Sequence, residues 1–83
     1  MDKLLVRLLV PVVQNCFDLF VPRDMEITTL TALMVEGVET LYKGRFSTSE
    51  PAVLLQKDLN LVFDPSCTLM DYGVKDGTLL VLL

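Results

Sequence analysis

The chain has 83 residues, of which 52% are hydrophobic, and it carries a formal net charge of −4. This length predicts a single domain over residues 1–83, and the composition is too apolar for a disordered chain. The seven basic residues are scattered among eleven acidic ones, which argues against nucleic-acid binding because phosphate recognition needs clustered positive charge.

Two apolar runs near the N-terminus predict a β-hairpin. Residues 4–10 are rich in Leu and Val and contain one charge, Arg7, as in a half-buried strand. Pro11 cannot donate to a β-ladder and ends this run, and residues 17–21 resume it around Asp18. Because side chains alternate between the faces of a strand, Arg7 and Asp18 set the outward phase of the two strands. No run reaches the roughly 18 apolar residues of a spanning helix, so no direct membrane insertion is expected.

An amphipathic helix of about four turns is predicted next. Asp24 is the expected N-cap, since its carboxylate can accept the unpaired N–H groups of a first helical turn. Lys43-Gly44 resembles a helix C-terminus, where glycine readily takes the left-handed conformation. The apolar residues between these two signals recur at spacings of three and four: Ile27, Leu30, Met34, Val38 and Leu41.

The second half of the chain predicts the rest of a sheet. Residues 45–51 are polar and read as a loop, and residues 52–56 and 59–63 read as strands joined by a turn at Lys57-Asp58. A single helical turn is expected at residues 69–72. A glycine-containing turn follows at residues 73–77, and the last strand covers residues 78–83. The predicted order is therefore two strands, a helix, two strands, a helical turn and a final strand.

No catalytic, cofactor-binding or metal site is expected. The chain lacks histidine, which removes the commonest general base and the commonest neutral metal ligand. Its serines and its two cysteines therefore have no imidazole to activate them. Cys16 and Cys67 are far apart in sequence and form no CxxC motif; free thiols in a reducing cytoplasm are favoured, and a disulfide between them stays open. We therefore expect a cytoplasmic protein that is not an enzyme.

The closing segment, Thr68-Leu69-Met70-Asp71-Tyr72 followed by a glycine turn and an apolar strand, resembles the end of a ubiquitin-like domain. Phe17-Asp18-Leu19 and the pattern from Leu69 to Thr78 are similar to the YukD or EsaB family of type VII secretion systems. This resemblance implies an α+β, β-grasp fold, with a mixed sheet of four to five strands packed on one helix. It also implies a protein without the diglycine tail of conjugated modifiers. The sequence ends on Leu82-Leu83, and we expect no conjugation.

The resemblance also leads to a candidate binding face. In a β-grasp sheet the first strand lies between the second and the last strand. By analogy, Leu79 and Val81 should point toward the helix together with Val6, Leu8, Phe17 and Leu19. The opposite, outer face would then carry a partner-binding patch composed of Leu5, Arg7, Leu9, Phe20, Leu80 and Leu82. Apolar patches of this kind are rare on monomers, so we expect a protein partner or a second copy of the chain to cover it. The alternative is that good strand-forming residues simply tolerate exposure.

Two functions remain open at this point. The first is a non-conjugating interaction module that serves as an accessory or regulatory component of a bacterial type VII secretion system, with membrane or ATPase components of the machine as partners. The second is a small structural β-grasp subunit of a multicomponent enzyme complex such as a bacterial monooxygenase. Neighbouring genes would separate the two, because the first requires secretion genes and the second requires diiron hydroxylase genes.

Overall fold

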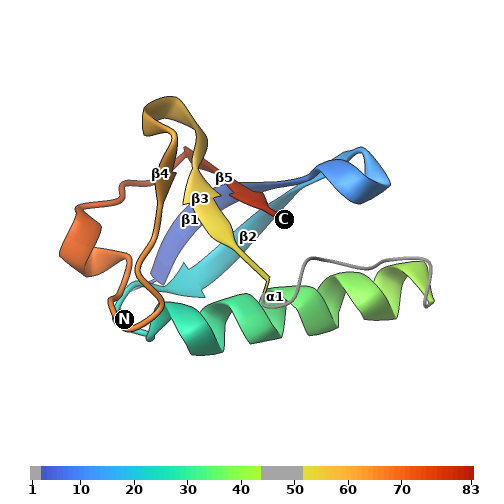
Figure 1. Cartoon of the computed structure of the whole chain (residues 1–83), viewed down its shortest axis with the longest axis horizontal. Coiled ribbons are helices and arrows are strands. Elements are labelled where there is room, and N and C mark those ends of the chain that lie inside the picture. Colours follow the sequence, from blue (N-terminus) through green and yellow to red (C-terminus); the bar gives the residue numbers. More distant parts are fainter. Residues whose placement is uncertain (1–2, 44–51) are drawn as a thin grey trace.

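One helix lies across one face of a mixed five-stranded sheet in the computed structural model, which describes residues 3–43 and 52–83 (Figure 1). The strand order is β2-β1-β5-β3-β4, so β1 lies between β2 and β5 as expected. This is the β-grasp arrangement that the resemblance implied, and the predicted element order is confirmed. The strands are β1 (Lys3–Val10), β2 (Asn15–Pro22), β3 (Leu54–Gln56), β4 (Leu61–Val62) and β5 (Thr78–Leu82).

In the first two strands, the charged residues Arg7 and Asp18 lie on the outer face of the sheet, as predicted. β1 pairs antiparallel with β2 over its whole length, and Arg7 lies directly opposite Asp18. Both of these side chains are exposed, whereas Val6 and Leu8 are fully buried on the other face of β1. On β2, Phe17 and Leu19 are half-buried against the core. The inward face of the hairpin is therefore the apolar one.

The helix α1 (Ile27–Tyr42) lies along one face of the sheet (Figure 1). Most of its predicted apolar stripe is buried there. The predicted N-cap was wrong, because the helix begins after Glu26, whose side chain makes no capping hydrogen bond. The backbone N–H of Ile27 instead donates to the carbonyl oxygen of Cys67 at 2.8 Å. The N–H of Thr28 donates to the carbonyl oxygen of Pro65 at 2.9 Å. A loop almost forty residues away thus accepts two of the N–H groups that the first helical turn leaves unpaired.

The C-terminal end of α1 is tied to the start of β2. The Asn15 side-chain amide donates to the Tyr42 hydroxyl at 3.0 Å, and the Tyr42 ring meets Phe17 edge-on at 6.4 Å. Lys43 adopts the left-handed conformation at the helix C-terminus, with a φ of 51°. Gly44, which was expected in that role, lies outside the described residues.

The core corrects the predicted phase of β5. Leu80 and Leu82 are 0% and 1% exposed and lie opposite Leu8 and Leu54, which are also buried. They belong to the core between sheet and helix and not to the outer face. Val81 and Leu79 take the outer face instead. The reason is physical: β5 contains no charged residue to mark its solvent side, so its sequence fits either phase equally well.

The turn before β5 is fixed by two glycines and one carboxylate. Gly73 and Gly77 have φ values of 65° and 85°, in the left-handed region that side-chain-bearing residues rarely adopt. Gly73 follows a 3-10 turn, η3 (Met70–Tyr72), at the position where a helical turn was predicted. The Asp76 carboxylate accepts the backbone N–H of Leu5 at 2.9 Å, and the Gly77 N–H donates to the Leu5 carbonyl oxygen at 2.8 Å. These bonds align β5 with β1.

The loop that caps α1 has its own polar contacts. The Tyr72 hydroxyl accepts the backbone N–H of Asp64 at 2.8 Å, and the Tyr72 ring packs edge-on against buried Phe63. Hydrogen bonds to the Asp64 carboxylate from the backbone N–H and then the hydroxyl of Ser66 hold the pKa of Asp64 below its ordinary value of 3.8. These contacts fix the conformation of the loop whose carbonyl oxygens cap α1.

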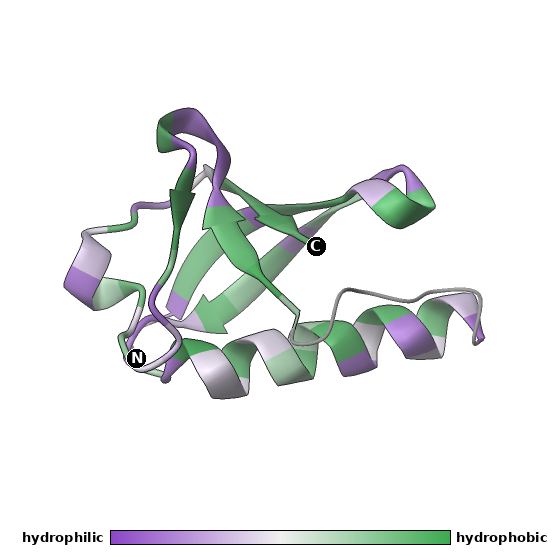
Figure 2. Cartoon of the chain, viewed as in Figure 1, coloured by the Kyte–Doolittle hydropathy of each residue, from purple (hydrophilic) through white to green (hydrophobic). Residues whose placement is uncertain are grey.

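Hydrophobic residues run along the strands of the sheet, and polar ones gather in the turns and along part of α1 (Figure 2). Cys16 and Cys67 are free thiols in this structure. Within residues 3–43 and 52–83, no helix is long and apolar enough to cross a membrane.

Candidate protein-interaction face

The outer face of the sheet carries an apolar row that crosses it from β1 to β4. The strand register places Leu9 of β1 beside Val81 of β5, Val81 beside Leu55 of β3, and Leu55 beside Val62 of β4. Directly paired residues of neighbouring strands project from the same face of a sheet. The four side chains therefore form one strip perpendicular to the strands, and Cys16 of β2 extends it at the opposite end.

Three further apolar side chains project from the same face. Leu79 lies in register with Arg7, and Leu5 lies in register with Phe20. Phe20 is 71% exposed, which is unusual for so large an apolar ring. We call the whole set the outer-face patch; its members are Leu5, Leu9, Phe20, Leu55, Val62, Leu79 and Val81.

Exposure varies within the outer-face patch. Val81 is only 7% exposed although it faces outward, because its neighbours Leu9 and Leu55 flank it on both sides. Phe20 and Val62 are exposed at the two ends, and the remaining members are intermediate. The centre of the outer-face patch is therefore a nearly buried aliphatic surface, and exposed apolar side chains lie at its two ends.

One ion pair is set within this face. Arg7 Nε lies 3.2 Å from Asp18 Oδ1 and donates a hydrogen bond to it, and both side chains are about 60% exposed. Such an exposed pair contributes little to stability, on the order of 0–1 kcal/mol. It separates Leu5 and Phe20 from the apolar row and provides a polar group beside an otherwise apolar surface. We expect it to orient a partner rather than to hold the fold together.

The structure places the six sequence-predicted site residues in two groups. Leu5, Arg7, Leu9 and Phe20 project from the outer face, as predicted. Leu80 and Leu82 do not, because both lie in the core. Sequence reasoning did not predict the outward positions of Leu55, Val62, Leu79 and Val81. The register between strands reveals them, and register is a long-range property that no local pattern of these short apolar strands specifies.

The face has the chemistry of a binding surface. Apart from Lys3, Arg7 and Asp18, the side chains that β1 and β2 present on this face are Leu5, Leu9, Phe20, Pro22 and, at the margin, the thiol of Cys16. Within residues 3–43 and 52–83, no group of three or more Cys, Asp or Glu side chains gathers to hold a metal ion. Burial of apolar surface against another protein is what this arrangement favours.

Comparison with known structures shows the same fold in proteins of the type VII secretion system. The ubiquitin-like domain of the Mycobacterium tuberculosis type VII secretion protein EccD1 superposes with a TM-score of 0.79 at 20% identity, covering 100% of this chain and 99% of that one. The EccD5 ubiquitin-like domain from Mycobacterium xenopi gives 0.77 at 13% identity, covering 100% and 97%. A chain of the MycP5-free ESX-5 inner membrane complex gives 0.83 at 11% identity; all of this chain matches 21% of that one.

Sequence comparison identifies the family. No match is found among curated proteins. The sequence profile of the family described as "WXG100 protein secretion system (Wss), protein YukD" matches residues 5–82, which is nearly the whole chain. The profile is that of a secretion-system component and indicates no enzymatic family. With its β-grasp fold, the chain belongs to the YukD family of ubiquitin-like proteins linked to WXG100, or type VII, secretion.

Proposed function

We propose that the chain is a non-conjugating interaction module that acts as an accessory or regulatory component of a bacterial type VII secretion system. It binds a protein component of the machine, in its membrane complex or its ATPase, through the outer-face patch and from the cytoplasmic side. The apolar row from Leu9 through Val81 and Leu55 to Val62 is the observation that carries this proposal.

Two further observations support it. The matching family is described as part of the WXG100 secretion system. A domain of the same fold occurs within a chain of the ESX-5 inner membrane complex, so this fold is compatible with assembly into a large secretion machine. The negative net charge argues against nucleic acid as an alternative partner.

The experiment is affinity capture from native cell fractions with a Leu9→Glu, Leu55→Glu double variant. These residues flank Val81, so two carboxylates would lie inside the interface. Burying them unpaired costs about 3 kcal/mol or more, and we expect partner recovery to fall by about 100-fold. Circular dichroism checks that the variant is folded, and mass spectrometry identifies the captured proteins.

Leu59→Glu is the matched control. Leu59 is 67% exposed in a 3-10 turn, η2 (Lys57–Leu59), beyond the outer-face patch. It should capture the same partner as the wild type. Equal recovery by the folded double variant would contradict the proposal, and recovery of a diiron hydroxylase subunit would favour the monooxygenase alternative. If a second copy of this chain covers the patch instead, sedimentation will show a wild-type dimer that the double variant lacks.

A further inference from the structure

A second apolar surface lies between the edge strand β2 and the helix α1. It is a groove of about 270 Å³ that contains no residue of the central apolar row, although Phe20 of the outer-face patch also lines it. On one side it is lined by β2 side chains such as Leu19 and Val21. On the other side it is lined by Leu33, Gly37 and Leu41 of α1. None of the residues that line it carries a charge or a hydrogen-bonding side chain, so its occupant must present apolar groups.

A glycine on the helical side of the groove leaves space that a larger side chain would fill. Leu33 and Leu41 are exposed on α1 although they belong to its apolar side, and Gly37 lies between them at a spacing of four residues. Gly37 costs helix stability, about 1 kcal/mol relative to alanine. Steric crowding does not require a glycine at this position, because a Cβ added to residue 37 would have no heavy atom of the surrounding structure within 4 Å. The missing side chain leaves a notch in the helical wall of the groove.

The other wall is an open strand edge. β2 ends the strand order, and within the described residues no strand pairs with its outer side. It is eight residues long and stays in register with β1 throughout, with neither a bulge nor an internal proline. Edge strands are normally shortened, kinked or charged to prevent pairing, as with β4 at the opposite edge, which has only two residues. Alternate N–H and C=O groups of β2 thus face outward beside an apolar groove.

We propose that this groove and the edge of β2 bind an extended segment of a partner protein, which adds to the sheet as a strand. Its alternate apolar side chains enter the groove beside Gly37, and basic side chains occupy the positions between them. Main-chain hydrogen bonds to β2 supply the alignment, and the apolar groove supplies selectivity, as in other cases of strand addition.

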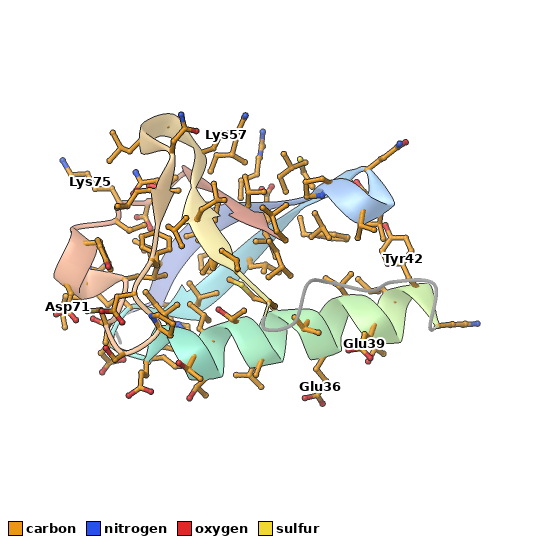
Figure 3. The ribbon with its side chains drawn as sticks, in the orientation of Figure 1. Glu36, Glu39, Tyr42, Lys57, Asp71 and Lys75 are labelled. Atoms are coloured by element: carbon orange, nitrogen blue, oxygen red, sulfur yellow. The ribbon has the colours of Figure 1, made fainter. Side chains whose placement is uncertain are left out.

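The charges around the groove explain why the bound segment should carry basic side chains. The charged residues of β2 and α1 are Asp18, Glu36 and Glu39, and all three are acidic. Asp18 projects from the outer face of β2 and pairs with Arg7 on the β1 side; a lysine or arginine of an added strand would be its cross-strand neighbour on the open side. Glu36 and Glu39 point away from the sheet along α1 and add to the negative field around the groove (Figure 3). The net charge of −4 on the whole chain also favours the approach of a basic segment.

The same observations disfavour other occupants. A groove of this size is below the roughly 300–1,000 Å³ of small-molecule sites and has no polar group to orient a ligand. A helix would leave the outward N–H and C=O groups of β2 without partners. A second copy carries the same net negative charge, and its own Phe17 is engaged by its Tyr42. An extended peptide with alternating basic and apolar residues can pair with the main chain of β2 and place its apolar side chains against α1.

The test is an NMR titration of the isotope-labelled full chain with the peptide acetyl-Val-Lys-Val-Lys-Val-Lys-Val-amide. We expect saturable shifts at the backbone amides of β2 and at Leu33, Gly37 and Leu41. Replacing each lysine by glutamate, or the valine at peptide position 3 by proline, should weaken binding by about tenfold, the equivalent of one good side-chain or charge contact. The first change tests the charge pattern, and the second tests main-chain pairing.

Gly37→Leu and Ala32→Leu form the matched pair of variants. A Cβ at position 37 meets no neighbouring atom within 4 Å, so a leucine side chain there should occupy the groove and weaken peptide binding by about tenfold. Ala32 is exposed on the same helix but does not line the groove, so Ala32→Leu should bind as the wild type does. The Leu9→Glu, Leu55→Glu variant should also bind the peptide normally, which separates this test from the apolar row of the outer-face patch; Phe20 is common to both surfaces.

Three results would overturn the proposal. They are the absence of saturable shifts in the wild type, shifts confined to the patch residues outside β2 and α1 (Leu5, Leu9, Leu55, Val62, Leu79 and Val81), and unchanged binding by Gly37→Leu. Self-association of the wild type that Gly37→Leu abolishes, without peptide binding, would assign the groove to a second copy instead.

Discussion

The corrected phase of β5 makes a sharp prediction about two adjacent leucines. Leu80 is 0% exposed in the core, and Leu79 lies beside it on the outer face. The same chemical change, leucine to alanine, should therefore have very different effects. Leu80→Ala leaves a cavity between sheet and helix and should destabilise the fold by about 3–5 kcal/mol, the upper part of the range for buried leucines. Leu79→Ala removes a partly exposed side chain and should cost about 1 kcal/mol or less.

These losses are large relative to the stability of so small a domain. For 83 residues the free energy of unfolding is expected to be about 4–12 kcal/mol. In urea, with a slope of about 1–2 kcal/mol per molar, a loss of 3 kcal/mol lowers the midpoint by about 1.5–3 M. Denaturation followed by circular dichroism measures both variants against the wild type. If Leu79→Ala proves as damaging as Leu80→Ala, or more so, the assignment of the two faces of β5 is wrong.

Three further perturbations test other parts of the structure. Met34→Ala should destabilise the fold by about 2–5 kcal/mol in urea denaturation, because Met34 is buried against the sheet; an unchanged midpoint would mean that the helix phase is wrong. Gly37→Ala should stabilise the fold by about 0.5–1 kcal/mol in the same assay, since its new Cβ meets nothing within 4 Å; a loss of stability would contradict the open groove. Asp64 has a lowered pKa, so its ionised form stabilises the fold above the ordinary value of 3.8, and this contribution is lost as the pH falls through the folded-state pKa. Asp64→Ala should therefore be less stable than the wild type near neutral pH and converge with it in acid, and a difference that stayed constant across a pH series of denaturation curves would exclude the hydrogen bonds from Ser66 as the cause.

The sequence predicts the fold wherever a charge or a break marks the pattern. Arg7 and Asp18 each interrupt an apolar run, and both mark the outer face correctly. Spacings of three and four residues define α1, whose predicted positions are buried except for Leu41. Gly73 and Gly77 mark the turn into β5, where the backbone needs the left-handed conformation. In each case a local preference and the final fold agree.

The features that could not be predicted depend on contacts distant in sequence. β5 carries no charge and is apolar from Leu79 to Leu82, so its neighbours β1 and β3 decide which of these side chains face the helix. Capping of α1 by the carbonyl oxygens of Pro65 and Cys67 replaces the local cap expected at Asp24. The apolar row across the outer face arises from the register of four strands, so four of the seven members of the outer-face patch are visible only in three dimensions.

Site-specific photo-crosslinking in cells that carry the secretion system tests the central claim most directly. A photoreactive residue at Val62, which is 58% exposed within the outer-face patch, should capture a membrane or ATPase component of the machine. The same residue at Met70, which is 54% exposed in η3 outside the patch, should not. The Val62 product should disappear when Leu9→Glu and Leu55→Glu are added. A Val62 product that persists in this folded double variant, or that Met70 yields equally well, would contradict the assignment of the outer-face patch as the binding surface.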